Sequence, residues 1–302
     1  MTISRQAKEK VLTEPAKFVE REIKAFAGAS LANRLSFIND YIIFDEPLVK
    51  FADGDDSIFT EYKTVIAPTH LTPREALAKT YDKSPEDMPE RLSVISWILP
   101  ITEETRKSNG SQTLTPGRLW SHTRWYGEQF NEAMRKHVVE FLGEMGYLAT
   151  APAIQPYLKM ETNEKGLYSN WSERHIAYAA GHGTFSLSDG FITERGIAHR
   201  CGSVVTDLIL PASHRTAESP YSNCLFYVDG SCKACIARCP SGAIMEKGHD
   251  KIKCGAYLIS IGYSSGMDYD NDVSVAGCGL CQTNVPCEYR IPAKIQKRKK
   301  VI

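Results

Sequence analysis

Apolar residues recur at helical spacing in three parts of the chain. Between Phe18 and Phe26 they stand three and four positions apart among charged residues, which predicts an amphipathic helix in the first 35 residues. The strongest helical pattern covers residues 126–145, and Gly146 follows it as a stop signal. A shorter helix is predicted over residues 173–180.

Short apolar runs between these helices predict strands. The run SVISWILP at residues 93–100 is almost continuously apolar, which is typical of a strand buried on both faces. Further strands are predicted at residues 147–150, 191–193 and 203–210. Because the strands alternate with helices, we predict a mixed α+β (α/β) body.

Composition narrows the possible functions. The 302 residues include 36 basic and 36 acidic side chains, and a chain without net charge is a poor match for a general nucleic-acid binder. No apolar run approaches the ~18 residues of a membrane span, and the polar N-terminus lacks the apolar stretch of a secretion signal. We therefore expect a cytoplasmic protein with neither a membrane nor a nucleic acid as its partner.

The cysteines are the most informative residues. Eight of the nine lie between Cys224 and Cys287, and Cys201 alone lies outside this stretch. Because a reducing cytoplasm keeps ordinary thiols reduced, clustered cysteines there indicate metal rather than disulfides. We predict a body at residues 1–217 and a metal-binding module at residues 218–302. The module ends in a basic tail, which is either simply solvated or a docking patch for an acidic electron donor.

Spacing within the module favours iron–sulfur clusters. Cys232, Cys235, Cys239 and Pro240 reproduce the C-x2-C-x3-C-P end of a bacterial ferredoxin run. Two [4Fe–4S] clusters would use all eight thiols, whereas two zinc sites are the main alternative because two Cys-x2-Cys pairs are present. The predicted metal ligands are Cys224, Cys232, Cys235, Cys239, Cys254, Cys278, Cys281 and Cys287.

One position departs from the ferredoxin run. The residue three places before Cys232 is Asp229, where the run has another cysteine. Cys224 restores the number of thiol ligands, and Asp229 is the alternative, as a ligand through oxygen.

Two polar features of the body are candidate sites. His182 lies between Gly181 and Gly183, where the backbone can approach a flat ligand closely, although a structural hydrogen bond is the alternative role. Thr206 and Asp207 follow an apolar run, and a buried carboxylate needs partners. This pair therefore either anchors the strand or lines a site.

The motifs occur in an order that resembles the epoxyqueuosine reductases. The sequence ERHIAYAAGHG at residues 173–183 resembles their ER-x-x-A-x-x-A-G-x-G segment, and GSVVTDLILP at residues 202–211 resembles their G-E-I-L-T-D-L strand. The ferredoxin run, the isolated Cys254 in KCGAYL, and the pair Cys278 and Cys281 then follow. The resemblance covers about residues 90–290.

The resemblance implies a fold and cofactors. These enzymes share with reductive dehalogenases a nitroreductase-like body that binds cobalamin and a ferredoxin-like module with two clusters. It implies that one cluster is held by Cys224, Cys232, Cys235 and Cys287, and that the other, nearer the corrinoid, is held by Cys239, Cys254, Cys278 and Cys281. Residues expected to line the cobalamin site are Arg124, Tyr126, Gly181, His182, Gly183, Thr206 and Asp207, with Tyr168 or His182 as proton donor.

The implied activity is the reduction of a small electrophilic substrate. A low-potential donor such as ferredoxin or flavodoxin would supply electrons through the two clusters to the corrinoid. Leu167 stands where the epoxyqueuosine reductases have a catalytic Asp, and Gln129–Asn131 replace their D-Y-H segment. We therefore expect a substrate other than epoxyqueuosine in tRNA. The alternative function is that of an electron-transfer protein or corrinoid reductase that activates a partner protein.

Overall fold

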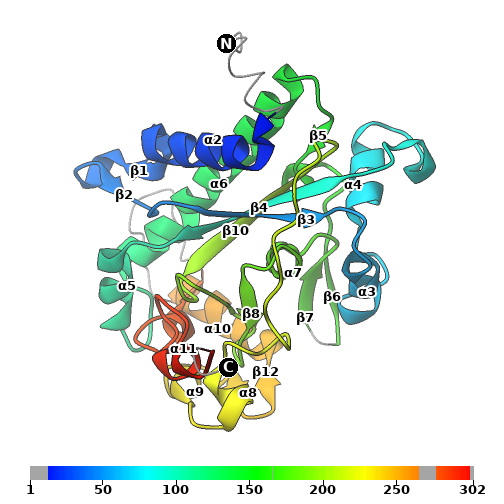
Figure 1. The fold of residues 1–302 in the computed structure, drawn as a ribbon. Coiled ribbons are helices and arrows are strands. Elements are labelled where there is room, and N and C mark those ends of the chain that lie inside the picture. Colours follow the sequence, from blue (N-terminus) through cyan, green and yellow to red (C-terminus); the bar gives the residue numbers. More distant parts are fainter. Residues whose placement is uncertain (1–12, 165, 265–276, 300–302) are drawn as a thin grey trace.

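A four-stranded antiparallel sheet forms the centre of the molecule, and helices cover both of its faces (Figure 1). The computed structural model describes residues 13–164, 166–264 and 277–299. In spatial order the sheet consists of β3 (Leu48–Asp53), β4 (Ser93–Pro100), β10 (His199–Thr206) and β5 (Ala149–Thr150).

Two helices pack on one face of the sheet, and three pack on the other. The first face carries α2 (Pro15–Ala29) and α6 (Arg118–Glu144). The second carries α3 (Ile58–Val65), α4 (Pro73–Thr80) and α7 (Glu173–Ala179), while α5 (Glu103–Gly110) packs against α6. No described helix has the length and apolar character needed to cross a membrane.

Small hairpins and short helices complete the body. The hairpin strands are β1 (Arg34–Leu35) with β2 (Tyr41–Ile42), β6 (Met160–Asn163) with β7 (Gly166–Ser169), and β8 (Gly183–Phe185) with β9 (Phe191–Thr193). The 3-10 helices of the body are η1 (Leu31–Asn33), η2 (Ser36–Ile38), η3 (Pro85–Asp87) and η4 (Pro152–Ile154).

The residues 218–264 and 277–299, here called the cysteine segment, lie at one end of the sheet, at the bottom of Figure 1. Its elements are α8 (Leu225–Asp229), α9 (Ala234–Ala237), β11 (Ile244–Met245), β12 (Gly248–His249), α10 (Lys251–Ser264), η5 (Leu280–Gln282) and α11 (Ala293–Lys299). Nothing in the structure tests the predicted boundary at residue 217. The chain still pairs with the body just before it, because Ser213 exchanges hydrogen bonds with Phe51.

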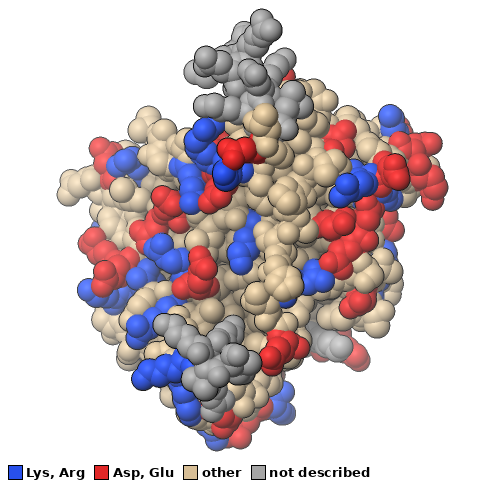
Figure 2. Space-filling view, viewed as in Figure 1, with Lys and Arg blue, Asp and Glu red and all other residues tan. Residues whose placement is uncertain are grey.

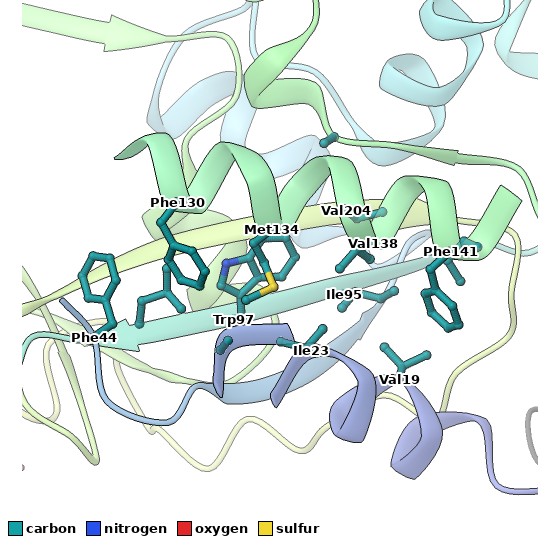
Figure 3. Close-up of a cluster of buried hydrophobic side chains, with 14 of the residues drawn as sticks. Val19, Ile23, Phe44, Ile95, Trp97, Phe130, Met134, Val138, Phe141 and Val204 are labelled. Carbon is teal, nitrogen blue, oxygen red and sulfur yellow. The ribbon is translucent and has the colours of Figure 1, made fainter. Parts of the chain in front are cut away.

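Side chains of the central strands alternate between two hydrophobic cores. Ile95 and Val204 point into the core beneath α2 and α6, which Figure 3 shows with Phe130 and Met134. The adjacent residues of both strands join the second core, on the face of α4 and α7. The continuous apolar run of β4 follows from helix coverage of both faces, as predicted for residues 93–100.

The predicted helices and strands are all present, with shifted ends. The strand predicted at residues 203–210 begins and ends four residues earlier, because its register pairs His199 with Pro100 and Thr206 with Ser93. Helix α6 begins eight residues before the predicted start. The sheet is entirely antiparallel, which places the body in the α+β class.

Lysines and arginines are interspersed with acidic side chains over the face shown in Figure 2. The pattern agrees with the zero net charge of the sequence.

Candidate functional site

The eight clustered cysteines form two groups in space. Four of them, Cys224, Cys232, Cys235 and Cys287, line one small space together with apolar residues of the body such as Ile192 and Ile197. The other four, Cys239, Cys254, Cys278 and Cys281, line the edge of a larger cavity. Cys281 lines both spaces, so the two groups are neighbours.

Short elements and glycine turns position the second group. Cys278 lies between Gly277 and Gly279, both in the left-handed backbone region. A Cβ atom on Gly279 would lie 1.9 Å from the ring of Trp120, so only glycine allows this turn to approach α6. The carbonyl of Gly277 accepts a hydrogen bond from Trp120 Nε1 at 3.2 Å.

Burial gives most of these thiols a raised pKa. Burial and neighbouring thiols raise the pKa of Cys235 and of Cys254 to about 11. Cys239 differs: burial acts to raise its pKa, but hydrogen bonds with the Ser241 hydroxyl and with backbone N–H groups outweigh burial and lower it. Because metals bind thiolates, a metal centre here would displace the protons that burial otherwise retains.

The first group contains Cys224 and not Asp229. Asp229 forms an ion pair with Lys294 at 2.7 Å and accepts a hydrogen bond from the backbone of Ser231 at 3.0 Å. These contacts hold the pKa of its carboxyl well below the ordinary value. Asp229 is absent from the residues that line the first group's space, whereas Cys224 is among them. Among the described residues, no three His, Cys, Asp or Glu side chains are placed to hold a single metal ion.

A cavity of about 640 Å³ lies between the body and the cysteine segment. Its size falls within the range of small-molecule sites, roughly 300–1,000 Å³. The body contributes residues of α6, α7, β10 and the β6–β7 hairpin. The charged side chains among the described residues that line it are Arg124, Glu128, Arg135, Glu173, Arg174 and Arg200.

An ion-pair network holds one wall of this cavity. Arg135 pairs with Glu128 at 2.9 Å and with Glu173 at 3.1 Å, and Arg200 also pairs with Glu128. Glu173 further accepts a hydrogen bond from Ser203 Oγ at 2.6 Å. Burial raises the pKa of Glu173, although Arg135 and Ser203 act to lower it.

Two buried nitrogen atoms of the network have no hydrogen-bond partner within the described part of the chain. They are Nε of Arg135, whose side chain is 3% exposed, and Nε of Arg200. Both residues line the cavity. A buried N–H group without a partner is costly, so each of these atoms needs an oxygen acceptor such as an ordered water.

Cys201, the one thiol outside the predicted metal-binding set, is a cavity residue that the sequence analysis does not predict. The structure places Cys201 on β10 in the wall of the large cavity, with its sulfur 3.6 Å from Nδ1 of His199. Nε2 of His199 lies 2.7 Å from the Phe191 carbonyl and therefore donates to it, which leaves Nδ1 as the acceptor for the thiol. Burial and the nearby charge of Glu173 raise the pKa of Cys201 to about 12. The alternation of a His and a Cys on one strand was the only signal in the sequence.

Of the residues predicted to line the cobalamin site, Arg124 alone lines this cavity. Tyr126 packs its ring 5.3 Å from that of Phe37, at the margin of the core beneath α2 and α6. Thr206 and Asp207 anchor the sheet: Thr206 Oγ1 accepts from the backbone of Leu208, and Asp207 Oδ1 accepts from the backbone of Leu148 at 2.8 Å. The geometry matches the anchoring role of this pair.

The predicted Gly181-His182-Gly183 motif lines a separate cavity of about 110 Å³. His182 Nε2 lies 3.0 Å from the Ser96 carbonyl, and burial lowers the pKa of the ring to about 3. The glycines allow close packing, because a Cβ atom on Gly183 would lie 2.1 Å from the Ile192 carbonyl oxygen. Close packing in this fold therefore explains the glycines of the motif, and a structural hydrogen bond explains its histidine.

Tyr168, the other predicted proton donor, lies on the β6–β7 hairpin. Its hydroxyl donates to Glu161 at 2.9 Å, and this hydrogen bond raises the pKa of Tyr168. Its neighbour Ser169 lines the large cavity, whereas Tyr168 is not among the lining residues. Alternation along the strand separates the two side chains.

Comparison with solved structures identifies the fold. The chain is similar to the catabolic reductive dehalogenase NpRdhA, with a TM-score of 0.52 and 11% identity over 98% of this chain and 40% of that one. The complex of the same enzyme with 3-bromo-4-hydroxybenzoic acid gives a TM-score of 0.50, with the same identity and coverage. Epoxyqueuosine reductase from Bacillus subtilis gives a TM-score of 0.46 and 15% identity over 93% of this chain and 68% of that one.

The likeness to the dehalogenase shows that this chain has the same fold, which confirms at the level of fold the resemblance drawn from the motifs. The chain spans less than half of the dehalogenase's length. No protein-family model and no curated protein sequence matches the chain.

Proposed function

We propose that this protein is an oxidoreductase that uses two [4Fe–4S] clusters and a corrinoid to reduce a small electrophilic substrate. One observation carries the proposal: eight thiols line two adjacent spaces that share Cys281, and one of these spaces is a ligand-sized cavity. Electron delivery to a cofactor bound in the cavity requires this arrangement, in which two neighbouring sets of thiols lead to the cavity. The shared fold supports the same reading.

The donor sets fit the clusters. Cys224, Cys232, Cys235 and Cys287 would hold one cluster, and Cys239, Cys254, Cys278 and Cys281 would hold the other. Cubane clusters take four thiolate ligands, so the eight thiols would supply two full sets. The cubanes would supply one-electron transfer at low potential.

The large cavity fits a polar, oxygen-rich ligand such as a corrinoid, whose rim carries amide groups. The guanidinium groups of Arg135 and Arg200 line this cavity and would face such carbonyl oxygens. The apolar side chains of Trp171 and Phe191 line the same space and would contact the ring. Bound there, a corrinoid would supply a strongly nucleophilic metal centre, while the protein orients the substrate and supplies protons.

Two groups of the chain can hold a proton at the cavity wall. Tyr168 and His182 are absent from the residues that line it, whereas Glu173 and Cys201 are present. Burial raises the pKa of both, but the ion pair with Arg135 stabilises the carboxylate of Glu173. The Cys201 thiol is oriented by Nδ1 of His199. We propose Cys201 as the proton donor to the reduced substrate.

The proposal extends to the substrate and the electron donor. A corrinoid would occupy part of the cavity of about 640 Å³. The rest of the volume would admit a small electrophile, such as an organohalide or an epoxide. Halogenated hydroxybenzoates, one of which is bound by the dehalogenase of the same fold, are the first compounds to screen. A low-potential ferredoxin or flavodoxin would supply electrons at the first group, whose Cys232 is partly exposed.

Metal analysis of anaerobically purified protein tests the clusters. We expect about eight irons and eight sulfides per chain, with two paramagnetic signals after reduction. Cys278→Ser should lose about half of the iron, whereas Cys201→Ser, a thiol outside both groups, should retain all of it. Fewer than about six irons in the wild type would contradict the two-cluster assignment.

Corrinoid binding separates the proposed reductase from the alternative, a protein that only transfers electrons to a partner. We expect hydroxocobalamin to bind the cluster-loaded protein at one to one, with a change in its visible absorption. Arg135→Met should weaken binding at least tenfold, and His182→Gln, at the separate cavity, should leave it unchanged. Failure of any corrinoid to bind would leave the electron-transfer alternative in place.

A further inference from the structure

Basic side chains flank one partly exposed thiol of the first group, Cys232. Lys233 follows it in the chain, at the start of α9, and its side chain is 55% exposed. Lys294, on α11, reaches the same place from another element: its Nζ lies 3.4 Å from the hydroxyl of Ser231, the residue before Cys232. A molecule that approaches this thiol from solvent therefore meets two ammonium groups.

Positive charge exceeds negative charge at this end of the molecule. Residues 218–302 include 12 basic and 8 acidic side chains, whereas residues 1–217 include 24 and 28. Lys233 and Lys294 each pair with one carboxylate. Arg290 and Lys297 are exposed and form no ion pair within the described part of the chain. A cluster held by the thiols would itself be negative, but these cations are the charges that a partner meets at the surface.

Two exposed tyrosines lie beside the same thiol group. Tyr221 and Tyr227 are 40% and 46% exposed, and their ring centroids are 4.3 Å apart. Tyr227 belongs to α8, whose Leu225 and Phe226 line the space of the first group. The helices α8, α9 and α11 lie together at the lower end of the molecule in Figure 1. Because tyrosine is enriched where proteins contact each other, this surface fits a protein partner better than a small ion.

We propose that this surface, here called the basic face, docks a one-electron carrier protein whose own contact surface is acidic. The inference rests on the proposed function. In each encounter the reduced carrier would lose one electron and the cluster of the first group would gain it, with no bond or proton transferred. Opposite charges speed such short-lived encounters, which need only a small contact area. The residues of the basic face are Tyr221, Tyr227, Lys233, Arg290, Lys294 and Lys297.

Stopped-flow mixing of the cluster-loaded protein with a reduced, acidic plant-type ferredoxin tests the inference. We expect the rate of ferredoxin oxidation to fall as salt is added, because salt screens exposed charges. The double variant Arg290→Glu, Lys297→Glu should slow this oxidation at least tenfold at low salt. The matched control Lys79→Glu, Lys136→Glu changes the net charge equally at exposed positions of α4 and α6, and should keep the wild-type rate within about twofold.

A small reductant separates the loss of docking from the loss of a cluster. Titanium(III) citrate needs no docking surface, so it should reduce the clusters of the Arg290 and Lys297 variant as fully as those of the wild type. An unchanged ferredoxin rate in this variant, or equal slowing in the Lys79 and Lys136 control, would overturn the inference and leave the proposed function intact. A wild-type protein without two reducible clusters would overturn the proposed function itself.

Discussion

The body and the cysteine segment are held together in different ways. The body has two large hydrophobic cores, in which side chains such as Trp97 and Phe130 are fully buried. The cysteine segment shares one small core with the body, and three of its six buried members, Leu187, Ile192 and Ile197, belong to the body. The comparison indicates that the body is stabilised by its own packing, whereas the cysteine segment depends on the body and on whatever its thiols bind.

The largest expected effect is that of removing the iron of the proposed clusters. Metal binding contributes directly to folding where a segment has little core of its own. After anaerobic chelation we expect amide protons of α8, α9 and η5 to lose most of their protection against hydrogen exchange. Those of β4 and β10 should keep theirs, because both strands are buried between the two cores of the body.

Equal protection of the cysteine segment with and without iron would contradict this difference between the two regions, because the segment would then fold on packing alone. Cys201→Ser provides the control, since it alters a thiol of the body that lies outside both groups. Its exchange pattern before chelation should match that of the wild type.

Acid should destabilise the body more than any single substitution at the surface. Burial lowers the pKa of His70 to about 4 and that of His175 and His182 to about 3. The unfolded chain takes up protons on these rings near pH 6.5, whereas the folded body does not. Stability is therefore complete above about pH 6.5 and falls as the pH drops toward the folded values. Each ring should cost about 2 kcal/mol at pH 5.

Denaturant unfolding of the body at pH 7 and pH 5 measures this loss. His182→Gln should reduce the difference between the two pH values by about 2 kcal/mol. His137→Gln, on the partly exposed side of α6, serves as the control. An unchanged difference in His182→Gln would show that the ring is protonated in the folded body.

One glycine allows the cysteine segment to approach α6 closely. Gly279→Ala would place a methyl group 1.9 Å from the Trp120 ring, at a residue with φ of +58°. We expect it to cost about 2–4 kcal/mol, because strain of about 1–3 kcal/mol adds to the steric clash. Gly255→Ala, in α10 with nothing within 4 Å, should be neutral or slightly stabilising. The thermal unfolding temperature and the iron content of each variant, measured against the wild type, test this expectation.

The sequence predicts the regular elements better than it predicts the cavity. Spacing alone identifies Cys232, Cys235 and Cys239 as one run. The division of the eight cysteines between two clusters stays a prediction of the family resemblance, because Cys281 lines both spaces. The spacing of the run is a local property, and the resemblance depends on the order of motifs along the chain. The grouping of Cys239 with Cys278 and Cys281 crosses about 40 residues, so the run by itself could not show it.

The lining of the large cavity depends on which face of each strand meets the cysteine segment. Cys201 and Glu173 lie in strongly patterned elements, but their sequence neighbours give no sign that the segment docks beside them. Tyr168 and Ser169 show the same limit, because one residue of register decides which of the two meets the cavity. Asp207 was predicted equally as anchor or as site, and only its bond to Leu148 separates the two roles.

The smallest expected effect concerns an ion pair across the contact between the regions. Arg106 on α5 lies 3.3 Å from Glu288 of the cysteine segment, and both side chains are nearly buried, at 10% and 15% exposed. Arg106 also donates to the Ile101 carbonyl, and Glu288 accepts from the backbone of Asn284, so each partner has support on its own side. A double-mutant cycle with Arg106→Met and Glu288→Gln should give a coupling of about 1 kcal/mol. If the regions differ as proposed, chelation of iron should abolish the coupling, because the ordered segment that presents Glu288 would be lost. A coupling that survives chelation would show that the body alone orders this part of the segment.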